Sequence, residues 1–288
     1  MARVLVLNAT GKVSSNVIDA VVAAGHTVTA ASRNPSEPST DAVRRVHFDY
    51  SDASTWDAAL DGVERLFWLS PPMVLNPDEL CGPFFDKALP QLDKVVLMTA
   101  AGIEHAGDIP LRRVEQKVEQ SGTAYSIVRP NWFHDNFHTF WIAGIQQAGV
   151  LALPAADAKS AFIDARDIGA SAAAALFDSS ADGKAFTLTG PESLTYTEAA
   201  AILSKAAGRE ITYQPIDDEP FIQTLISFGI PEGYARFLDG LFQAVRAGGA
   251  AQTTDDVKTL LGREPISLAT YAAEHVVDFA PAEAAPAK

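Results

Sequence analysis

The 288-residue sequence contains a single cysteine, Cys81. One cysteine can form neither an internal disulfide framework nor the paired thiolates of a structural zinc site. Basic residues are also few, and none of them form a run. The 36 acidic residues against 22 basic ones produce a formal charge of −14. Because this balance repels phosphate backbones, we expect no nucleic-acid partner.

Long apolar segments are absent as well. The longest, residues 170–177, contains a serine and falls well short of the roughly 20 residues that cross a membrane. The apolar start, Val4 to Leu7, is too short for the core of a signal peptide. With 48% hydrophobic residues, the chain can bury a large core. We therefore expect a cytoplasmic protein without a membrane partner, with a disordered tail over residues 280–288; its oligomeric state stays open.

Short apolar runs alternate with helical patterns through the first half of the chain. Strands are predicted at residues 3–7, 27–31, 43–48, 65–69, 94–98 and 124–128, and helices at 13–24, 54–60, 79–92 and 111–121. Strands that are apolar on both faces and separated by helices are typical of a parallel sheet with helices on both sides. The prediction is an α/β fold with a doubly wound parallel Rossmann sheet.

The pattern changes after Pro130. Residues 131–147 are aromatic-rich with helical spacing, and a short strand is predicted at 161–163. Asp167 is a candidate N-cap of a helix over 168–177, and residues 185–188 are a candidate last strand of the main sheet. Thr195 and Glu198 have capping-box spacing. We predict a dinucleotide-binding domain over 1–130 with returns near 161–190, and a smaller, interleaved C-terminal substrate lobe over most of 131–279.

The first strand leads into Asn8-Ala-Thr-Gly-Lys-Val-Ser14, which has the spacing of a dinucleotide-binding turn but only its middle glycine, Gly11. Such a turn needs tight backbone geometry and a helix N-terminus that faces a pyrophosphate. Asn8 tolerates left-handed backbone, and Ser14 is small enough for close helix–strand packing. This position between strand and helix predicts dinucleotide binding; the alternative is a turn that binds nothing.

The second strand ends without the acidic residue that holds the ribose of NAD. Ser32 and Arg33 stand there instead. A guanidinium can hold a 2′-phosphate through charge-assisted hydrogen bonds worth about 1.5–3 kcal/mol, and Lys12 and Ser32 could add to them. The sequence therefore favours NADP(H) over NAD(H); the alternative is a solvated surface arginine.

Several further motifs carry a family resemblance. They are Ala-Thr-Gly-Lys (9–12), Ala-Ser-Arg (31–33), Phe48-Asp49, Ser70-Pro71-Pro72, Ser-Ile-Val-Arg-Pro-Asn-Trp-Phe (126–133), Asn136, Phe-Ile-Asp-Ala-Arg-Asp-Ile (162–168) and Leu-Thr-Gly-Pro-Glu (188–192). With these motifs the chain resembles the atypical, NmrA-like short-chain dehydrogenases/reductases. Within them it is most similar to the ergot-alkaloid-biosynthesis group of agroclavine dehydrogenase-like reductases.

The resemblance implies where a nicotinamide cofactor would lie. It would cross Thr10, Gly11, Lys12 and Val13, with Arg33 at the phosphorylated ribose. The resemblance further places Asp49 and Tyr50 near the adenine, Ser70 and Pro71 beside the cofactor, and Thr99 and Pro130–Phe133 at the nicotinamide and substrate.

The Tyr-x-x-x-Lys dyad of the wider superfamily does not occur in the sequence. By resemblance, Glu115 matches a glutamate that follows the lysine by four residues, so Leu111 and Gly107 occupy the positions of the dyad. Hydride delivery to a carbonyl needs a proton donor, whereas delivery to an iminium yields a neutral amine and needs none. The chemistry favoured is hydride transfer to iminium or conjugated acceptors such as quinones.

Two histidines, His105 and His134, are candidates for a replacement acid, although either could be an ordinary solvated histidine. Trp132, Phe133 and Phe137 are candidates for a flat substrate pocket, although aromatic residues at helical spacing are more often core. The metal prediction is none.

We therefore predict an NADPH-dependent reductase of a small conjugated or iminium-type substrate, in secondary metabolism. Two other functions stay open. One is an NmrA-like redox sensor that binds the dinucleotide without turnover, and the other is a non-redox cyclase or isomerase on the same fold.

Overall fold

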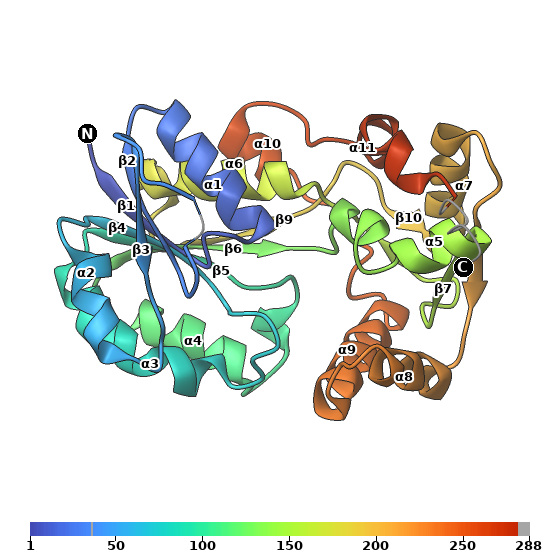
Figure 1. Cartoon of the computed structure of the whole chain (residues 1–288), viewed down its shortest axis with the longest axis horizontal. Coiled ribbons are helices and arrows are strands. Elements are labelled where there is room, and N and C mark those ends of the chain that lie inside the picture. Colours follow the sequence, from blue (N-terminus) through green and yellow to red (C-terminus); the bar gives the residue numbers. More distant parts are fainter. Residues whose placement is uncertain (36, 282–288) are drawn as a thin grey trace, which may run out of the picture. The chain divides into compact units, whose positions relative to one another are not determined.

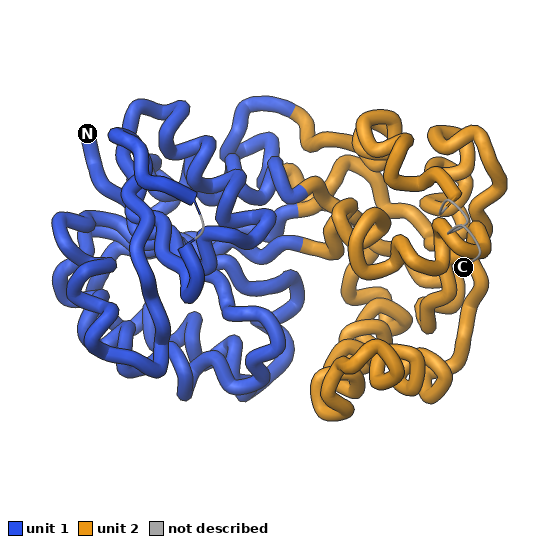
Figure 2. Tube along the Cα trace, viewed as in Figure 1, with its two compact units in different colours: residues 1–130, 165–188, 256–263 blue, residues 131–164, 189–255, 264–288 orange. Residues whose placement is uncertain are grey.

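The computed structural model describes residues 1–35 and 37–281. The chain divides into two compact units (Figure 2). Unit 1 comprises residues 1–130, 165–188 and 256–263, and unit 2 comprises residues 131–164, 189–255 and 264–288. The tail predicted over 280–288 lies, from residue 282 onward, outside the described residues.

Unit 1 is built on a seven-stranded sheet in the order β3-β2-β1-β4-β5-β6-β9. Every neighbouring pair is parallel. The strands are β1 (Arg3–Leu7), β2 (Thr27–Ser32), β3 (Val43–His47), β4 (Arg65–Leu69), β5 (Lys94–Met98), β6 (Ala124–Pro130) and β9 (Lys184–Leu188). The predicted doubly wound sheet is confirmed. Its order reverses between β1 and β4, and ligands bind beyond the carboxyl ends of strands at such a point.

Helices cover both faces of this sheet (Figure 1). One face carries α1 (Lys12–Ala23), α6 (Ala165–Phe177) and α10 (Asp256–Leu261), and the other carries α2 (Trp56–Leu60), α3 (Pro77–Ala88) and α4 (Pro110–Glu119). On the second face, strand residues such as Leu66 and Leu97 pack against Phe84 and Phe85 of α3. Cys81 lies in this core, and burial raises the pKa of its thiol to about 12.

The strand predicted at 185–188 is β9, which pairs with β6 and ends the main sheet. Asp256, in the first turn of α10, accepts a 2.7 Å hydrogen bond from the backbone N–H of Thr187 in β9. The prediction that Asp167 caps a helix is wrong, because α6 begins two residues earlier, at Ala165. The Asp167 carboxylate is buried and forms an ion pair of 2.6 Å with Arg263.

Unit 2 holds two small sheets and several helices. β7 (Val150–Leu153) pairs with β11 (Thr212–Pro215), and β8 (Lys159–Ser160) pairs with β10 (Leu194–Thr195). The helices are η4 (His134–His138), α5 (Ile142–Ala148), α7 (Tyr196–Ala207), α8 (Asp218–Ser227), α9 (Glu232–Arg246), α11 (Leu268–Glu274) and η6 (Val276–Phe279). The capping box at Thr195 and Glu198 is confirmed.

Two predictions of local structure in unit 2 differ from the structure. The helix expected over 131–147 is split into η4 and α5. The strand expected at 161–163 is wrong: β8 ends before it, at Ser160, and within the range only Ile163 forms a bridge, with Phe133. Aromatic side chains from these segments join one apolar core with Tyr196 and Phe242. No helix in the described part of the chain is long and apolar enough to cross a membrane.

Gly169 is required for the contact between α1 and α6. A Cβ atom at this position would lie 2.5 Å from the Cβ of Asn16 and 2.9 Å from its carbonyl carbon. We expect Gly169→Ala to lower the free energy of unfolding by about 1–3 kcal/mol, because two packed helices would have to separate. Urea unfolding checks this value. Gly82→Ala in α3 is the matched control, since nothing lies within 4 Å of its added Cβ, and we expect a gain of about 0.5–1 kcal/mol. Equal effects of the two substitutions would contradict the packing argument.

Candidate cofactor site

The turn between β1 and α1 has the geometry of a dinucleotide-binding turn with a single glycine. Asn8 adopts a left-handed backbone with φ of 52°, and its side-chain amide donates a 3.0 Å hydrogen bond to the carbonyl of Leu69 at the end of β4. The Gly11 N–H donates to the Asn8 carbonyl over 2.8 Å, and a Cβ at Gly11 would lie 3.1 Å from that oxygen. Ser14 is buried, and its hydroxyl donates to the carbonyl of Leu7. Asparagine and serine therefore serve two positions where the spacing expects glycine.

The N-terminus of α1 suits an anionic ligand. Gly11 is its N-cap and supplies no side chain to cap the helix, and the first turn contains no acidic residue. Backbone N–H groups and the positive end of the helix dipole therefore face the space before the helix. Thr10 and Lys12 are exposed beside this end, whereas Val13 is buried beneath it. These residues fit a pyrophosphate group.

Arg33 follows the end of β2 and is exposed, next to the half-buried Ser32. In the described part of the chain, its guanidinium forms no ion pair. Hydrogen bonds from the side chain and backbone of Ser51 lower the pKa of Asp49, and the charge of Arg33 lowers it further. Asp49, whose charge interacts with Arg33, accepts hydrogen bonds from the Ser51 hydroxyl and N–H over 2.6 Å and 2.8 Å and forms no ion pair with Arg33, so the guanidinium can bind a phosphate.

Tyr50 is placed differently from its neighbour Asp49. Its ring packs edge-on against Phe48 and Phe84, with centroids 4.8 and 5.9 Å away, and burial raises the pKa of its hydroxyl. Most of the Tyr50 ring therefore packs against the hydrophobic core on the α3 side of the sheet.

The carboxyl ends of β4, β5 and β6 border the same edge. The Ser70 hydroxyl contacts the carbonyl of Pro71 after β4. Thr99 continues the ladder of β5, because its N–H donates to the Val128 carbonyl over 3.0 Å. The next turn is tied to β6 in the same way, by a 3.1 Å bond from the Ala101 N–H to the Pro130 carbonyl.

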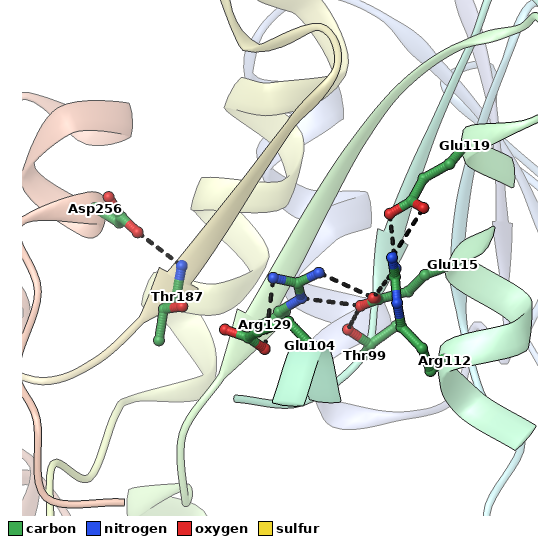
Figure 3. Close-up of polar contacts among 8 residues, drawn as sticks. All are labelled: Thr99, Glu104, Arg112, Glu115, Glu119, Arg129, Thr187 and Asp256. Atoms are coloured by element: carbon green, nitrogen blue, oxygen red, sulfur yellow. Dashed lines mark hydrogen bonds and ion pairs between the residues drawn. The ribbon is translucent and has the colours of Figure 1, made fainter. Parts of the chain in front are cut away.

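Thr99 is hydrogen-bonded to a buried ionic network that joins α4 and β6 (Figure 3). The carboxylate of Glu115, in α4, is fully buried and accepts a 2.6 Å hydrogen bond from the Thr99 hydroxyl. Arg129, in β6, donates to both of its oxygens, over 3.0 and 2.9 Å. Arg112 donates over 2.7 Å and also holds Glu119. The network therefore joins the ends of β5 and β6 to α4.

Burial alone would raise the pKa of Glu115, but the bonds from Arg129, Thr99 and Arg112 outweigh burial and lower it. The same pairing raises the pKa of Arg129 despite its burial. Glu115 is therefore held as a carboxylate and is not a proton donor. The pairing of Arg129 with Glu115 was not predicted from the sequence. Arg129 lies two residues after the buried Ile127 and therefore on the same face of β6, and a charged residue on an apolar strand face is the signal that could have indicated a buried acidic partner.

The two positions that correspond to the missing dyad carry no acid. Gly107 has a left-handed backbone with φ of 74°, and Leu111 packs against the core below α4. His105, in η3 (Ile103–His105), is exposed, and its imidazole has no hydrogen bond within the described residues.

The remaining predicted residues belong to unit 2. His134 is buried there, with its backbone N–H bonded to the Ile163 carbonyl over 2.8 Å. Trp132 and Phe133 are half-buried, and the Trp132 ring lies 4.7 Å from that of Phe242. Phe137 is fully buried in the core of this unit.

The lowered pKa of Glu115 predicts a pH dependence of stability. The carboxyl of Glu115 has a lower pKa in the folded chain than in the unfolded chain. Its ionisation therefore stabilises the fold fully above the ordinary glutamate pKa of about 4.3, and this stabilisation is lost as the pH falls through the lower pKa of the folded state. We expect Glu115→Gln to unfold more easily than the parent at pH 7 and to lose stability less steeply below pH 4. Urea titrations between pH 3 and 7 measure both slopes, and parallel slopes would contradict the prediction.

Comparison with known proteins identifies two matching families. Residues 9–178 match the NAD(P)H-binding family, and residues 112–272 match the NmrA-like family. The chain is 30% identical to an NAD(P)H azoreductase of Xenophilus azovorans over 96% of its length and 99% of that protein's. It is 28% identical to an agroclavine dehydrogenase of Claviceps fusiformis, over 94% and 96% of the two chains.

One solved structure shows the same fold over nearly the whole chain. It is an NADPH-dependent quinone oxidoreductase of Escherichia coli in complex with NADPH. The TM-score is 0.82 at 23% sequence identity, and the match covers 94% of this chain and 99% of the other.

Proposed function

The chain belongs to the NmrA-like family of NAD(P)H-binding oxidoreductases, and from this premise we propose that it is an NADPH-dependent reductase of a small conjugated or iminium-type organic substrate, in secondary metabolism. The observation that carries the preference for NADPH is the exposed Arg33 guanidinium directly after β2. At this position the sheet has an arginine and not the acidic residue that would bind the ribose of NAD. A nicotinamide cofactor supplies a hydride when it is bound.

The residues of unit 1 have distinct tasks in this proposal. The turn from Asn8 to Gly11 and the N-terminus of α1 hold the pyrophosphate, and Arg33 holds the 2′-phosphate. Ser70, Pro71, Thr99 and Pro130 border the nicotinamide end, with Asp49 and Tyr50 on the adenine side. The network around Glu115 keeps the ends of β5 and β6 in register, which positions this edge without donating a proton.

The choice of substrate follows from the missing acid. Leu111 and Gly107 cannot donate a proton, and the Thr99 hydroxyl is bonded to a carboxylate. Reduction of an iminium carbon forms a C–H bond and leaves a neutral amine, so no proton is required. Reduction of a conjugated acceptor such as a quinone leaves a stabilised anion that water can protonate. An azoreductase, a quinone oxidoreductase and an agroclavine dehydrogenase among the similar proteins support this class of acceptor.

The test is NADPH oxidation by the purified chain with three kinds of acceptor: a naphthoquinone, a cyclic iminium and a simple ketone. We expect turnover of the first two and none of the ketone, with deuterium from C4-labelled NADPH recovered in the amine that forms from the iminium. Gly11→Val is the background control, because its side chain would press on the Asn8 carbonyl. If no acceptor oxidises NADPH, the reductase proposal fails.

The absence of the dyad also favours a second candidate, a redox sensor that binds the dinucleotide without turnover. A sensor would bind NADPH and NADP with different affinities and would not oxidise NADPH with any acceptor. The acceptor panel therefore separates the two functions.

A further inference from the structure

The carboxyl end of β3 places a histidine beside the proposed 2′-phosphate site. His47 is the last residue of β3 and is paired in register with Ser32 of β2. The next N–H along, that of Phe48, donates to the Ser32 carbonyl over 3.0 Å. His47 and Arg33 therefore emerge from adjacent strands at the same edge of the sheet.

A hydrogen bond fixes the orientation of the His47 ring. Its Nδ1 lies 2.7 Å from the carbonyl oxygen of Arg33. Because a carbonyl only accepts, Nδ1 must carry the proton and donate. The Nε2 atom is then the one that changes with protonation: it accepts when the ring is neutral and donates when the ring is charged. The ring is exposed, and no described residue forms a hydrogen bond with Nε2.

The charged groups around His47 are mixed. The guanidiniums are those of Arg33, directly after β2, and Arg45, in β3. The carboxylates are those of Glu37, Asp49 and Asp52 in the adjoining loops. Arg45 lies on the same face of β3 and is paired with Glu37. Arg44, on the opposite face, is paired with Asp61.

The two aspartates remain anionic next to this edge. Hydrogen bonds from Ser51 and Ser54 lower the pKa of Asp49 and Asp52 respectively, and the charge of His47 lowers both further. Glu37 and Arg45 neutralise each other. Among the described groups around His47, an incoming phosphate dianion therefore meets two carboxylates outside any ion pair, those of Asp49 and Asp52, and one such guanidinium, that of Arg33. A protonated imidazole at this edge would offset part of that repulsion.

We propose that His47 is a second determinant of NADPH specificity, which donates from Nε2 to the 2′-phosphate beside Arg33. This inference rests on the proposed function, which places the 2′-phosphate at Arg33. Because Nδ1 donates to the Arg33 carbonyl, Nε2 can donate only when the ring carries a second proton, so the preference for a 2′-phosphate should be greater at pH 6 than at pH 8. Without His47, Arg33 alone sets the preference.

The experiment titrates the full chain with adenosine 2′,5′-bisphosphate and with 5′-AMP in a calorimeter, at pH 6 and pH 8. The ratio of the two affinities measures recognition of the 2′-phosphate. We expect His47→Gln to reduce this ratio about tenfold at pH 6 and less than threefold at pH 8. His47→Lys should keep the ratio high at both values. Protonation of the phosphate itself, near pH 6, affects every variant alike and cancels in the comparison.

Arg44→Gln, on the other face of β3, is the control and should leave the ratio unchanged. The inference would be overturned if His47→Gln and the parent had the same ratio of the two affinities at both pH values. That outcome, combined with weakened binding in Arg33→Ala, would leave the NADPH proposal intact. If the parent shows no preference for the 2′-phosphate at either pH, the proposed cofactor preference itself fails.

Discussion

Arg129→Ala is expected to lower the free energy of unfolding by about 3–5 kcal/mol at pH 7. The substitution leaves the Glu115 carboxylate fully buried without its bidentate partner, and the remaining bonds from Thr99 and Arg112 cannot neutralise it to the same extent. Removal of one partner of a buried pair costs far more than the pair contributes, because the other charge stays desolvated. Urea unfolding followed by circular dichroism measures the change.

Two further variants identify the cause. Arg113→Ala, in α4 close to Glu115, removes a half-exposed arginine bonded to Asp78 and Asp108, and should change stability little. The double variant Glu115→Leu with Arg129→Met replaces the pair by apolar side chains and should recover much of the loss. If Arg129→Ala proves no more destabilising than Arg113→Ala, the network does not hold this edge of the sheet.

Arg33→Ala is expected to raise the Kd for NADPH between about tenfold and a hundredfold and to leave the Kd for NADH within twofold. The guanidinium would form charge-assisted bonds only with the 2′-phosphate, and such bonds are worth about 1.5–3 kcal/mol. Calorimetric titrations with both nucleotides measure the two constants. Arg33→Lys should retain part of the preference, because lysine keeps the charge but not the forked geometry.

Arg236→Ala serves as the control for a general charge effect. This arginine is exposed in α9 and paired with Glu232. Its removal changes the net charge by the same amount as Arg33→Ala and should leave both dissociation constants unchanged. An equal loss of NADPH affinity in the two variants, or tighter binding of NADH than of NADPH by the parent, would argue against recognition by Arg33.

Much of unit 1 could be predicted because its signals are local. The central strands β1, β4 and β5 are mostly apolar runs of five residues, and the left-handed backbone at Asn8 follows from a residue type that tolerates it. The proposed role of Arg33 could also be predicted, because the apolar run over residues 27–31 indicates where the second strand ends and Arg33 follows that end. Where the local signal is weaker, the prediction is wrong: Asp167 has the residue type of a helix cap, but its place is explained by the ion pair with Arg263.

By itself the sequence determined the parallel sheet, the dinucleotide-binding turn, the absence of the proton-donating dyad and the cation beyond β2. Tertiary structure alone decided that Glu115 and Arg129 meet, that residues 256–263 return to support β9, and that His47 bonds to the Arg33 carbonyl. The physical reason is the range of the interactions. Periodicity and turn conformation depend on neighbours along the chain, whereas the partner of a buried charge depends on which strands and helices the sheet brings together.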